Sequence, residues 1–567
     1  MSSADQEARL HLDAGRPEQA EAVLRAQLER SPRDARLRAM LAQLLASRGR
    51  REDAIAQLKL AVEHAPGARD ARLLLARLAN EHGQPALAEH HAGWLTARNP
   101  RDSEAWSALG FAAFGLGRRH AARDAFQKAV TQSPGYAAAR YNLASVLCDF
   151  EFSEEALAEA EEAVRLGARS RGAALVRARA LVQLDRLDEA ESVLTRLLAE
   201  NPVDVDGQGL LVQLRQLRGD ADPLRDLRLA ARSASAPAAV RLALGDAQRR
   251  SGDFAAAEEE LRRLLAECGR LPQLLASLAS VLQESGRVTE AFGYSREAHS
   301  QAPGDAGVAE NFVATAIASG NSAEALPVVE RFRAALPRDQ RWITYRIDIA
   351  RLRGEHGFDD WFDPRVVTRS FELGAPPGYR NLREFHEALE ALLHVRHRQK
   401  NHPLEQSLRQ GTQTSRSLLI RPEPAITQLF ALFEGALAEY QSGIGSTPAH
   451  PLFSRNSSQA ALIGCWSVRL RRDGFHVNHI HPEGWLSSAY YVSVPDEVAD
   501  AGSRAGWLKF GEPRFPVAGL EPLAFVQPVP GKLVLFPSYL WHGTNPIRGN
   551  AARLSVAFDA LPRTEVQ

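Results

Sequence analysis

Small and apolar residues recur with a period of 34 residues through the first 337 positions of the chain. An alanine marks the register, with a slip of one residue where Leu224 interrupts it, and in most units a glycine precedes it by five residues and a proline follows it by twelve. The alanines are Ala20, Ala54, Ala88, Ala122, Ala156, Ala190, Ala257, Ala291 and Ala325. Glycine favours the left-handed end of a helix, alanine lets two helices approach closely, and proline stops a helix. The pattern therefore predicts a helical hairpin, repeated about ten times over residues 1–337.

The clearest copy of the repeat, residues 103–134, resembles the tetratricopeptide repeat. It carries Trp106, Leu109, Gly110, Ala122, Phe126, Ala129 and Pro134 in one register. The resemblance implies a right-handed solenoid whose inner groove holds a protein or peptide, with Asn142 and Asn311 at a position that often contacts the ligand backbone. The register is weakest over residues 217–237, where we expect a distorted hairpin.

After Pro337 the period stops, and the sequence becomes rich in aromatic and loop-forming residues such as Trp342, Trp361 and Phe362. Helical spacing of apolar residues returns over residues 382–394 and 424–440. These two predicted helices could cover the last hydrophobic face of the solenoid. We assign residues 338–400 to a helical linker and capping region.

From Cys465 the hydrophobic pattern changes to a period of two, which is typical of strands. The predicted strands are residues 465–470, 486–494, 506–510, 532–536 and 553–558, separated by glycine and proline. Several short strands at this spacing favour a sandwich or barrel. We therefore assign residues 401–567 to a β-domain.

The histidines and one arginine of this β-domain are the candidate chemistry. His479 and His481 are two residues apart, so on an extended chain both side chains can reach one metal ion, and His542 could add a third nitrogen. Arg553 and Ser555 share one face of a strand and predict an anion site. His476 is off this register and is expected to be a structural residue.

This order of parts resembles the iron(II)- and 2-oxoglutarate-dependent oxygenases. The matching segments are HIHPEGWLSSAYYVSVP, residues 506–510, PGKLVLFPSYLWHGTNP and RLSVAF, and HPLEQSLRQGTQT resembles the segment that precedes the core in bacterial members that carry tetratricopeptide repeats. The resemblance implies a double-stranded β-helix (jelly-roll) domain after an α-solenoid. It also implies that His479 and His542 bind Fe(II), that Arg553 and Ser555 hold the carboxylate of 2-oxoglutarate, and that Trp485, Tyr490 or Tyr491 lines the pocket, with Tyr491 assigned to the co-substrate.

The sequence departs from that family at the acidic ligand. The usual iron site has two histidines and one carboxylate, and here His481 stands where the acid is expected. We assign the metal and the catalysis to His479, His481 and His542. The pair His481 and Glu483 has the same two-residue spacing and is the alternative.

Three functions are compatible with these features. The preferred one is an oxygenase that couples decarboxylation of 2-oxoglutarate to hydroxylation of a protein or peptide recruited by the solenoid. The alternative is a non-catalytic repeat scaffold with a cupin-like metal- or ligand-binding β-domain, which the missing carboxylate supports. The third is an oxygenase of small molecules, in which the solenoid serves dimerisation or localisation.

Composition narrows the class of partner. The 69 basic and 69 acidic residues cancel, so total charge favours neither nucleic acid nor an anionic membrane.

The three cysteines, Cys148, Cys268 and Cys465, are far apart and odd in number, which argues against a disulfide framework and favours a reducing compartment. The first residues lack an apolar leader core, and no apolar run is long enough to span a membrane. We expect a soluble, cytoplasmic protein; the sequence does not specify its oligomeric state.

Overall fold

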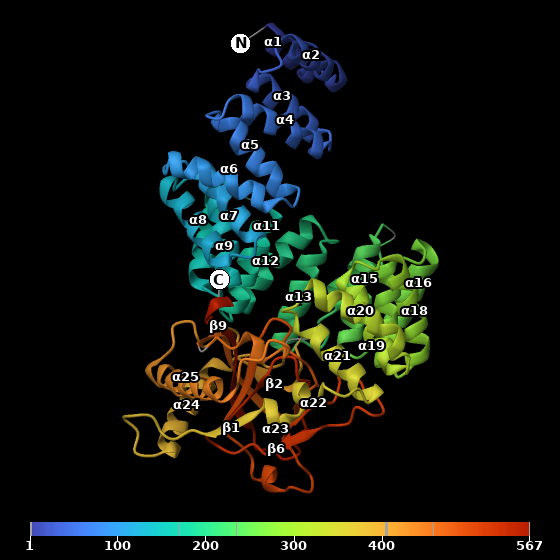
Figure 1. Cartoon of the computed structure of the whole chain (residues 1–567), viewed down its shortest axis with the longest axis vertical. Helices are drawn as coiled ribbons and strands as arrows, with labels where there is room; N and C mark the ends of the chain where they lie inside the picture. The colour runs from blue at the N-terminus through green and yellow to red at the C-terminus, as the bar shows by residue number, and fades with distance from the viewer. Residues whose placement is uncertain (1–2, 169, 234, 403–405, 458, 566–567) are drawn as a thin grey trace. The chain divides into compact units, whose positions relative to one another are not determined.

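A computed structural model describes residues 3–565 of the 567-residue chain, except 169, 234, 403–405 and 458. The chain forms two compact units, residues 1–180 and 181–566. The first unit is helical, and the second contains the later helices and the whole β-domain (Figure 1). Within the described residues, no helix combines the length and apolarity needed to cross a membrane.

Within the described part of residues 1–337, twenty consecutive helices follow the predicted period, and one hairpin is shorter than the others. In the first unit these are α1 (Ser3–Asp13), α2 (Pro17–Arg30), α3 (Ala35–Ser47), α4 (Arg51–His64), α5 (Arg69–Glu81), α6 (Pro85–Arg98), α7 (Ser103–Gly115), α8 (Arg119–Gln132), α9 (Ala137–Asp149) and α10 (Ser153–Arg165). Helix α11 (Arg171–Gln183) crosses the boundary, and the second unit continues with α12 (Leu187–Glu200), α13 (Val205–Arg218), α14 (Arg225–Ala231), α15 (Ala238–Arg250), α16 (Phe254–Cys268), α17 (Pro272–Glu284), α18 (Val288–Gln301), α19 (Ala306–Ala318) and α20 (Ser322–Ala335).

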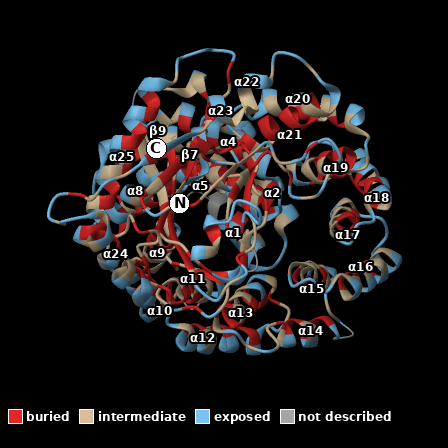
Figure 2. Ribbon diagram, turned by 90° about the horizontal axis from the view of Figure 1, so that it is seen from below, coloured by how far each residue is buried: buried red, intermediate tan, exposed pale blue. Residues whose placement is uncertain are grey.

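The residues that mark the repeat have the roles that the sequence predicts. Every repeat alanine from Ala20 to Ala325 has 0% of its surface exposed, because the two helices of each hairpin meet at that point. The repeat glycines adopt positive φ at the ends of the first helices, as Gly117 (φ 76°) and Gly286 (φ 84°) do. The α-solenoid prediction is therefore confirmed, and Figure 2 shows α12 to α20 following one another along an arc within the second unit.

The distorted hairpin lies where the register is weakest. Gly219 still ends α13 in the left-handed conformation, but α14 has only 7 residues. Pro237 holds an extended conformation (φ −60°, ψ 147°) immediately before α15, so the chain cannot continue as helix through that point. The second helix of this hairpin is therefore half as long as the others.

Helix α21 (Gln340–Arg353) covers the end of the solenoid, where the sequence suggested loops. Trp342 is fully buried and stacks on Phe332 of α20, with ring centroids 4.5 Å apart. The other side of α21 contacts the β-domain, where Thr344 Oγ1 donates to the carbonyl oxygen of Tyr539 (2.5 Å). Ten of the residues between Gln340 and Ala350 are buried. The amphipathic pattern is missing because the helix is covered on all sides.

The linker region also supplies part of the β-domain. After the short helices α22 (Asp359–Phe362) and α23 (Pro364–Val367), strand β1 (Arg369–Glu372) pairs with β7 of the main sheet. Helices α24 (Leu382–Arg396) and α25 (Pro424–Gly443) form where the sequence predicts them. They pack mainly on strands β4 and β3, and it is α21 rather than α24 or α25 that packs on α20 at the end of the repeats. The end of α24 lies beside α11.

Two antiparallel sheets form the β-domain. The remaining strands are β2 (Leu408–Gln413), β3 (Ala460–His476), β4 (Leu486–Ser493), β5 (Leu508–Phe510), β6 (Ala524–Val526), β7 (Lys532–Pro537), β8 (His542–Thr544) and β9 (Arg553–Pro562). The strand orders are β1-β7-β4-β9-β3-β2 and β6-β5-β8. Strand β2 arises from HPLEQSLRQGTQT, whose polar pattern predicts no element; residues 403–405 lie outside the described residues.

The main sheet has one face against helices and one face toward the second sheet. Phe558 of β9 and Tyr490 of β4 both contact Phe433 of α25, with ring centroids 4.8 and 5.4 Å away. Side chains alternate along a strand, so residues of odd number in β9 point away from α25. Of these, Arg553, Ser555, Ala557 and Asp559 lie on the inner face of the sheet.

Candidate metal centre

Three histidines from two distant segments meet beside the inner face of the main sheet. His479 and His542 form an antiparallel bridge, in which each backbone N–H donates to the other's carbonyl oxygen (2.9 and 3.0 Å). The backbone N–H of His481 donates to the carbonyl oxygen of Ser538 (3.0 Å). One possible ligand atom from each imidazole lies within 4.8 Å of the other two, which is close enough for one metal ion to bind all three. The structure thus brings the predicted triad together.

Gly543 allows this close approach. A Cβ atom at this position would lie 2.2 Å from Oδ1 of Asn478 and 2.9 Å from the carbonyl oxygen of His476. Strand β8 could not lie against the 476–479 segment with any larger residue there. A glycine is therefore required after His542 for steric reasons, whether or not a metal binds.

A hydrogen bond at Nδ1 of each histidine determines which ring nitrogen is available to bind a metal. Nδ1 of His479 donates to the carbonyl oxygen of Val477 (2.8 Å), and Nδ1 of His542 donates to that of Leu540 (2.9 Å). Nδ1 of His481 donates to both carboxylate oxygens of Asp559, at 2.6 and 2.7 Å. All three partners can only accept, so the proton is on Nδ1 and the lone pair is on Nε2 in each neutral ring. This is the usual arrangement of imidazole ligands.

Asp559 is the residue that sequence reasoning missed. It lies on the inner face of β9, six residues after Arg553, and its Oδ1 also accepts a hydrogen bond from Ser487 Oγ (2.7 Å). The period of two from Arg553 was the available signal, because it places residue 559 on the same face. The centre therefore has a carboxylate in contact with His481 rather than in its place.

Burial and the neighbouring charges set the protonation of the triad. Burial, and then the proximity of His481, lowers the pKa of His479 to about 3. Burial also holds the pKa of His542 well below its ordinary value. For His481 the effect of burial is outweighed by the negative charge and hydrogen bond of Asp559, so its pKa is raised. At neutral pH, His479 and His542 are uncharged and can donate lone pairs to a metal.

A buried cation without an anionic partner lies on the same face of β9. Arg553 is 3% exposed; its Nη1 donates to the carbonyl oxygen of Gly506 (2.6 Å), and its Nε has no partner. The guanidinium lies 5.6 Å from the ring centre of Tyr491, whose buried hydroxyl also has no partner. Among the described residues no carboxylate forms an ion pair with Arg553. A buried guanidinium normally requires an anion, so this site fits a bound carboxylate.

The structure separates the remaining candidates. Ser555 is buried on the inner face beside Tyr491, its partner in the strand pairing. Glu483 is exposed in the turn that follows His481, and it is not among the residues whose possible ligand atoms converge at the triad. Tyr490 points to the opposite face, where its hydroxyl contacts His386 Nε2 (2.8 Å), and Trp485 donates from Nε1 to the carbonyl oxygen of Leu452 (3.0 Å). Of the three aromatic residues that could line the pocket, Trp485 and Tyr490 are therefore directed elsewhere, and Tyr491 is on the inner face. Trp466 of β3 is also on that face, with its ring 5.8 Å from that of His481.

His476 has a supporting position beside the triad. Its ring lies 5.9 Å from that of His479, and Ser407 Oγ contacts both Nδ1 of His476 (3.1 Å) and Nε2 of His479 (3.3 Å). Burial, the nearby histidines and the positive charge of Arg553 hold its pKa well below its ordinary value. The charges of both Arg553 and the triad histidines thus act on His476, but His476 is not one of the three histidines whose possible ligand atoms converge.

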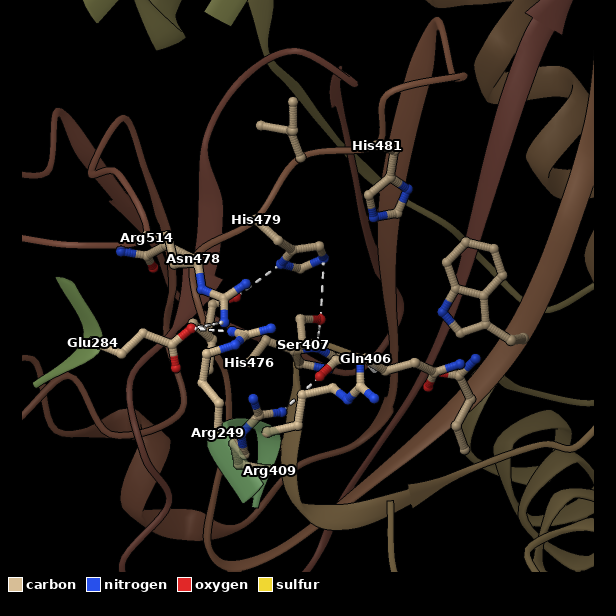
Figure 3. Close-up of a pocket in the computed structure, with 15 residues that line it drawn as sticks. Arg249, Glu284, Gln406, Ser407, Arg409, His476, Asn478, His479, His481 and Arg514 are labelled. Atoms are coloured by element: carbon tan, nitrogen blue, oxygen red, sulfur yellow. Dashed lines mark hydrogen bonds and ion pairs between the residues drawn. The ribbon is translucent and has the colours of Figure 1, made fainter. Parts of the chain in front are cut away.

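A cavity of about 650 Å³ opens onto His479 and His481 (Figure 3). Its wall includes residues of the solenoid helices α15 and α17 as well as residues of the β-domain. A second cavity of about 410 Å³ runs along α17, α19 and α21 and also reaches His479. Asn311, the predicted groove residue, lines this second cavity, and its Nδ2 donates to Ser280 Oγ (2.9 Å). The inner surface of the second unit's solenoid therefore borders the metal centre.

Comparison with protein families agrees with both parts of the chain. Residues 464–559 match the family described as "Putative 2OG-Fe(II) oxygenase". Tetratricopeptide repeat models match residues 11–68, 73–137, 108–149, 141–205 and 242–306. The chain combines tetratricopeptide repeats with a domain of the 2OG-Fe(II) oxygenase family. The oxygenase-family segment begins in β3, includes the whole triad, and ends at Asp559.

Three matching solved structures each align with less than half of the chain. PilF from Pseudomonas aeruginosa is 18% identical over 36% of this chain and 94% of its own, with a TM-score of 0.34. A tetratricopeptide repeat protein from Parabacteroides merdae is 14% identical over 44% of this chain and 99% of its own, with a TM-score of 0.36. MamA from Desulfovibrio magneticus is 20% identical over 30% and 96%, with a TM-score of 0.28. No curated protein matches the chain.

The residues of the oxygenase-family domain fit the cofactors that the family implies. Three Nε2 lone pairs form a donor set suited to Fe(II) and also to Zn(II). The unpartnered Nε of Arg553 and hydroxyl of Tyr491 are donors that a carboxylate of 2-oxoglutarate would satisfy. Neither the metal-binding set nor the carboxylate-binding set includes Glu483.

Proposed function

We propose that the protein is an iron(II)- and 2-oxoglutarate-dependent oxygenase that hydroxylates a protein or peptide substrate. The observation that carries the proposal is the pairing of a three-imidazole site with a buried, unpaired Arg553 on the inner face of one sheet. His479, His481 and His542 would hold the metal through Nε2, and Arg553, Tyr491 and Ser555 would hold the far carboxylate of 2-oxoglutarate. When bound, iron(II) and 2-oxoglutarate would supply the oxidative chemistry: dioxygen would be consumed, one of its oxygen atoms entering succinate as carbon dioxide leaves, and the other entering the hydroxylated substrate.

The protein's own residues position and protect this site. The carbonyl oxygens of Val477 and Leu540 and the carboxylate of Asp559 orient the three rings. Asp559 places a negative charge beside His481, one of three proposed imidazole ligands. It would therefore supply, through a hydrogen bond to a ligand, part of the negative charge that a carboxylate ligand would supply directly. Ser407 can donate to Nε2 of His479. It can therefore occupy that lone pair until a metal displaces it.

The proposed substrate is a polypeptide, because the cavity at the triad is walled partly by the repeat helices. Tetratricopeptide repeats are typical protein-binding modules, and an extended segment in the groove of the second unit would pass His479. Cytoplasmic location remains part of the proposal, supported by the odd number and wide spacing of the three cysteines in the sequence.

Turnover of 2-oxoglutarate tests the proposal. Purified protein with iron(II), ascorbate and oxygen is expected to form succinate, and His542→Ala is expected to abolish it. His394→Ala, which removes an exposed histidine of α24, serves as the matched histidine control and should retain most of the turnover. Equal succinate formation by wild type and His542→Ala would contradict the proposal.

A zinc-binding scaffold is the second candidate, and the all-imidazole ligand set favours it. In that case the purified protein would retain zinc, and 2-oxoglutarate would neither bind nor be consumed. Metal analysis of protein purified without chelators distinguishes the two.

A further inference from the structure

Four arginines line the cavity that opens onto the triad. Arg249 and Arg250 come from the end of α15, Arg409 from β2, and Arg514 from the loop after β5. Among the described residues of the lining, the acidic one is Glu284, at the end of α17. The described lining therefore carries a formal excess of positive charge within the cavity that contains His479 and His481 (Figure 3).

Glu284 shows how a carboxylate is held here. Arg249 Nη1 and Arg514 Nη2 both donate to its Oε1 atom, the latter at 3.4 Å. Within the described residues, Arg409 donates to the carbonyl oxygens of Gln406 (2.6 Å) and Leu408 (2.8 Å) and to no carboxylate. Nε of Arg249 is buried and has no partner. The cluster can therefore accept a second carboxylate beside Glu284.

We propose that this arginine cluster (Arg249, Arg250, Arg409 and Arg514) binds an aspartate or glutamate side chain of the polypeptide substrate, so that the protein selects acidic peptides. This inference rests on the proposed function only in treating the peptide as the substrate. Arginine is suited to the role, because its planar fork pairs with a carboxylate through two parallel hydrogen bonds. The position beside His479 would hold the neighbouring residues of the peptide at the metal centre.

The adjoining cavity favours a peptide over a nucleic acid. Glu310 and Asp348 line it together with Glu284, and it shares Arg249, Arg514 and His479 with the first cavity. A nucleic acid carries a phosphate at every nucleotide, and these phosphates would be repelled by the acidic groups along the groove. A peptide can place one carboxylate at the arginine cluster and neutral residues along the acidic part. The arginine cluster is also distinct from Arg553, which lines neither cavity.

Binding of two labelled peptide pools to the metal-free full-length protein tests the inference. One fluorescein-labelled 12-residue pool has Asp or Glu at a single central position and random uncharged residues elsewhere, and the matched pool has Asn or Gln at that position. By fluorescence anisotropy we expect the acidic pool to bind at least about tenfold more tightly. Arg514→Gln and Arg409→Gln should each weaken its binding about fivefold to tenfold, without changing the binding of the neutral pool.

Arg383→Gln is the matched control, since it removes an 88% exposed arginine from α24 in the same unit. It should leave both affinities unchanged. Arg409 also binds backbone carbonyl oxygens, so a folding defect in Arg409→Gln is checked by thermal unfolding. Arg514, whose side chain is 45% exposed, provides the variant that is expected to fold normally.

Three results would overturn the inference: equal affinity for the two pools, unchanged binding by a folded Arg514→Gln, or displacement of the acidic pool by millimolar 2-oxoglutarate. The last result would assign the arginine cluster to the co-substrate. Because no iron is present in this experiment, its failure is separable from failure of the oxygenase proposal, which is judged by iron and 2-oxoglutarate binding.

Discussion

Asp559 accepts a hydrogen bond from Nδ1 of His481 at 2.6 Å, although the two residues are 78 positions apart in the chain. The family that matches residues 464–559 is expected to have a carboxylate two residues after the first iron-binding histidine, and here that position is His481. In this structure a carboxylate instead contacts the histidine at that position through Nδ1. This relationship determines how the centre should respond to mutation.

Replacing Asp559 should weaken the metal centre without removing a ligand. In Asp559→Asn the amide can still contact His481, but the negative charge and the strong hydrogen bond are lost. We expect the affinity for iron(II) to fall by about 10-fold to 100-fold. Anaerobic competition with a chromophoric chelator measures it. Asp500→Asn, an exposed carboxylate of the same domain, should bind iron like wild type. Unchanged affinity in Asp559→Asn would show that Asp559 does not support the centre.

Arg553→Lys separates charge from shape at the anion site. Lysine keeps the positive charge but cannot form the paired hydrogen bonds of a guanidinium. We expect 2-oxoglutarate to bind at least about tenfold more weakly. Iron(II) affinity measured without 2-oxoglutarate should be unchanged, because Arg553 contacts none of the triad. Equal 2-oxoglutarate affinity in the two proteins would exclude Arg553 as the carboxylate-binding residue.

Asp348 should make the second unit less stable at high pH. This fully buried carboxyl on α21 accepts a hydrogen bond from Trp541 Nε1 (2.9 Å), and burial raises its pKa to about 7. Its pKa is near 3.8 when the chain unfolds. Between these values the unfolded chain releases the proton and the folded chain keeps it. Stability therefore falls as pH rises from about 4 to 7, by roughly 4 kcal/mol once the loss is complete.

Urea unfolding at pH 5 and pH 8 checks this prediction. Asp348→Asn keeps an acceptor for Trp541 but cannot ionise, so its stability should depend less on pH than that of wild type, with a relative gain at pH 8. Asp500→Asn should follow wild type. If Asp348→Asn and wild type lose stability equally between the two pH values, Asp348 does not titrate in this range.

Gly110 of α7 allows the packing of the first unit to be tested. A Cβ atom at Gly110 would lie 2.6 Å from a ring carbon of Phe126, which is 2% exposed. We expect Gly110→Ala to lower the opening free energy of α7 and α8 by about 1–3 kcal/mol. Amide hydrogen exchange in the full chain measures it. Gly93→Ala, at a helix position with nothing within 4 Å, should instead be neutral or stabilising. Faster exchange in both variants would contradict the steric explanation.

Much of the fold follows from the sequence because several residue types share one register. Alanine, glycine and proline at fixed offsets fix the hairpin, and the order His479, His481, His542, Arg553 indicates the site. Helix α21 escaped prediction because it is buried on all sides and so lacks an amphipathic pattern. The amphipathic pattern of α24 and α25 predicts one buried face but not the surface that covers it. The double-stranded β-helix arrangement of the two antiparallel sheets stays a prediction.

Asp559 shows where sequence reasoning ends at the site itself. No motif connects it to His481, and only the pairing of β9 with β4 brings it to the triad. The same holds for Arg249 and Glu284, which belong to the solenoid in sequence and to the cavity of the metal centre in structure. Such contacts depend on how α21 joins the solenoid to the β-domain within the second unit.

Anaerobic titration of the purified protein with iron(II) and then 2-oxoglutarate tests the central claim most directly. Chelation of the metal by the keto acid gives a weak visible charge-transfer band, which reports binding of both groups at one site. The account predicts a band that saturates with one iron per chain in wild type and is lost in His542→Ala, and that needs far more 2-oxoglutarate in Arg553→Ala. Absence of the band in wild type that has bound iron would contradict the claim that this centre is an oxygenase site.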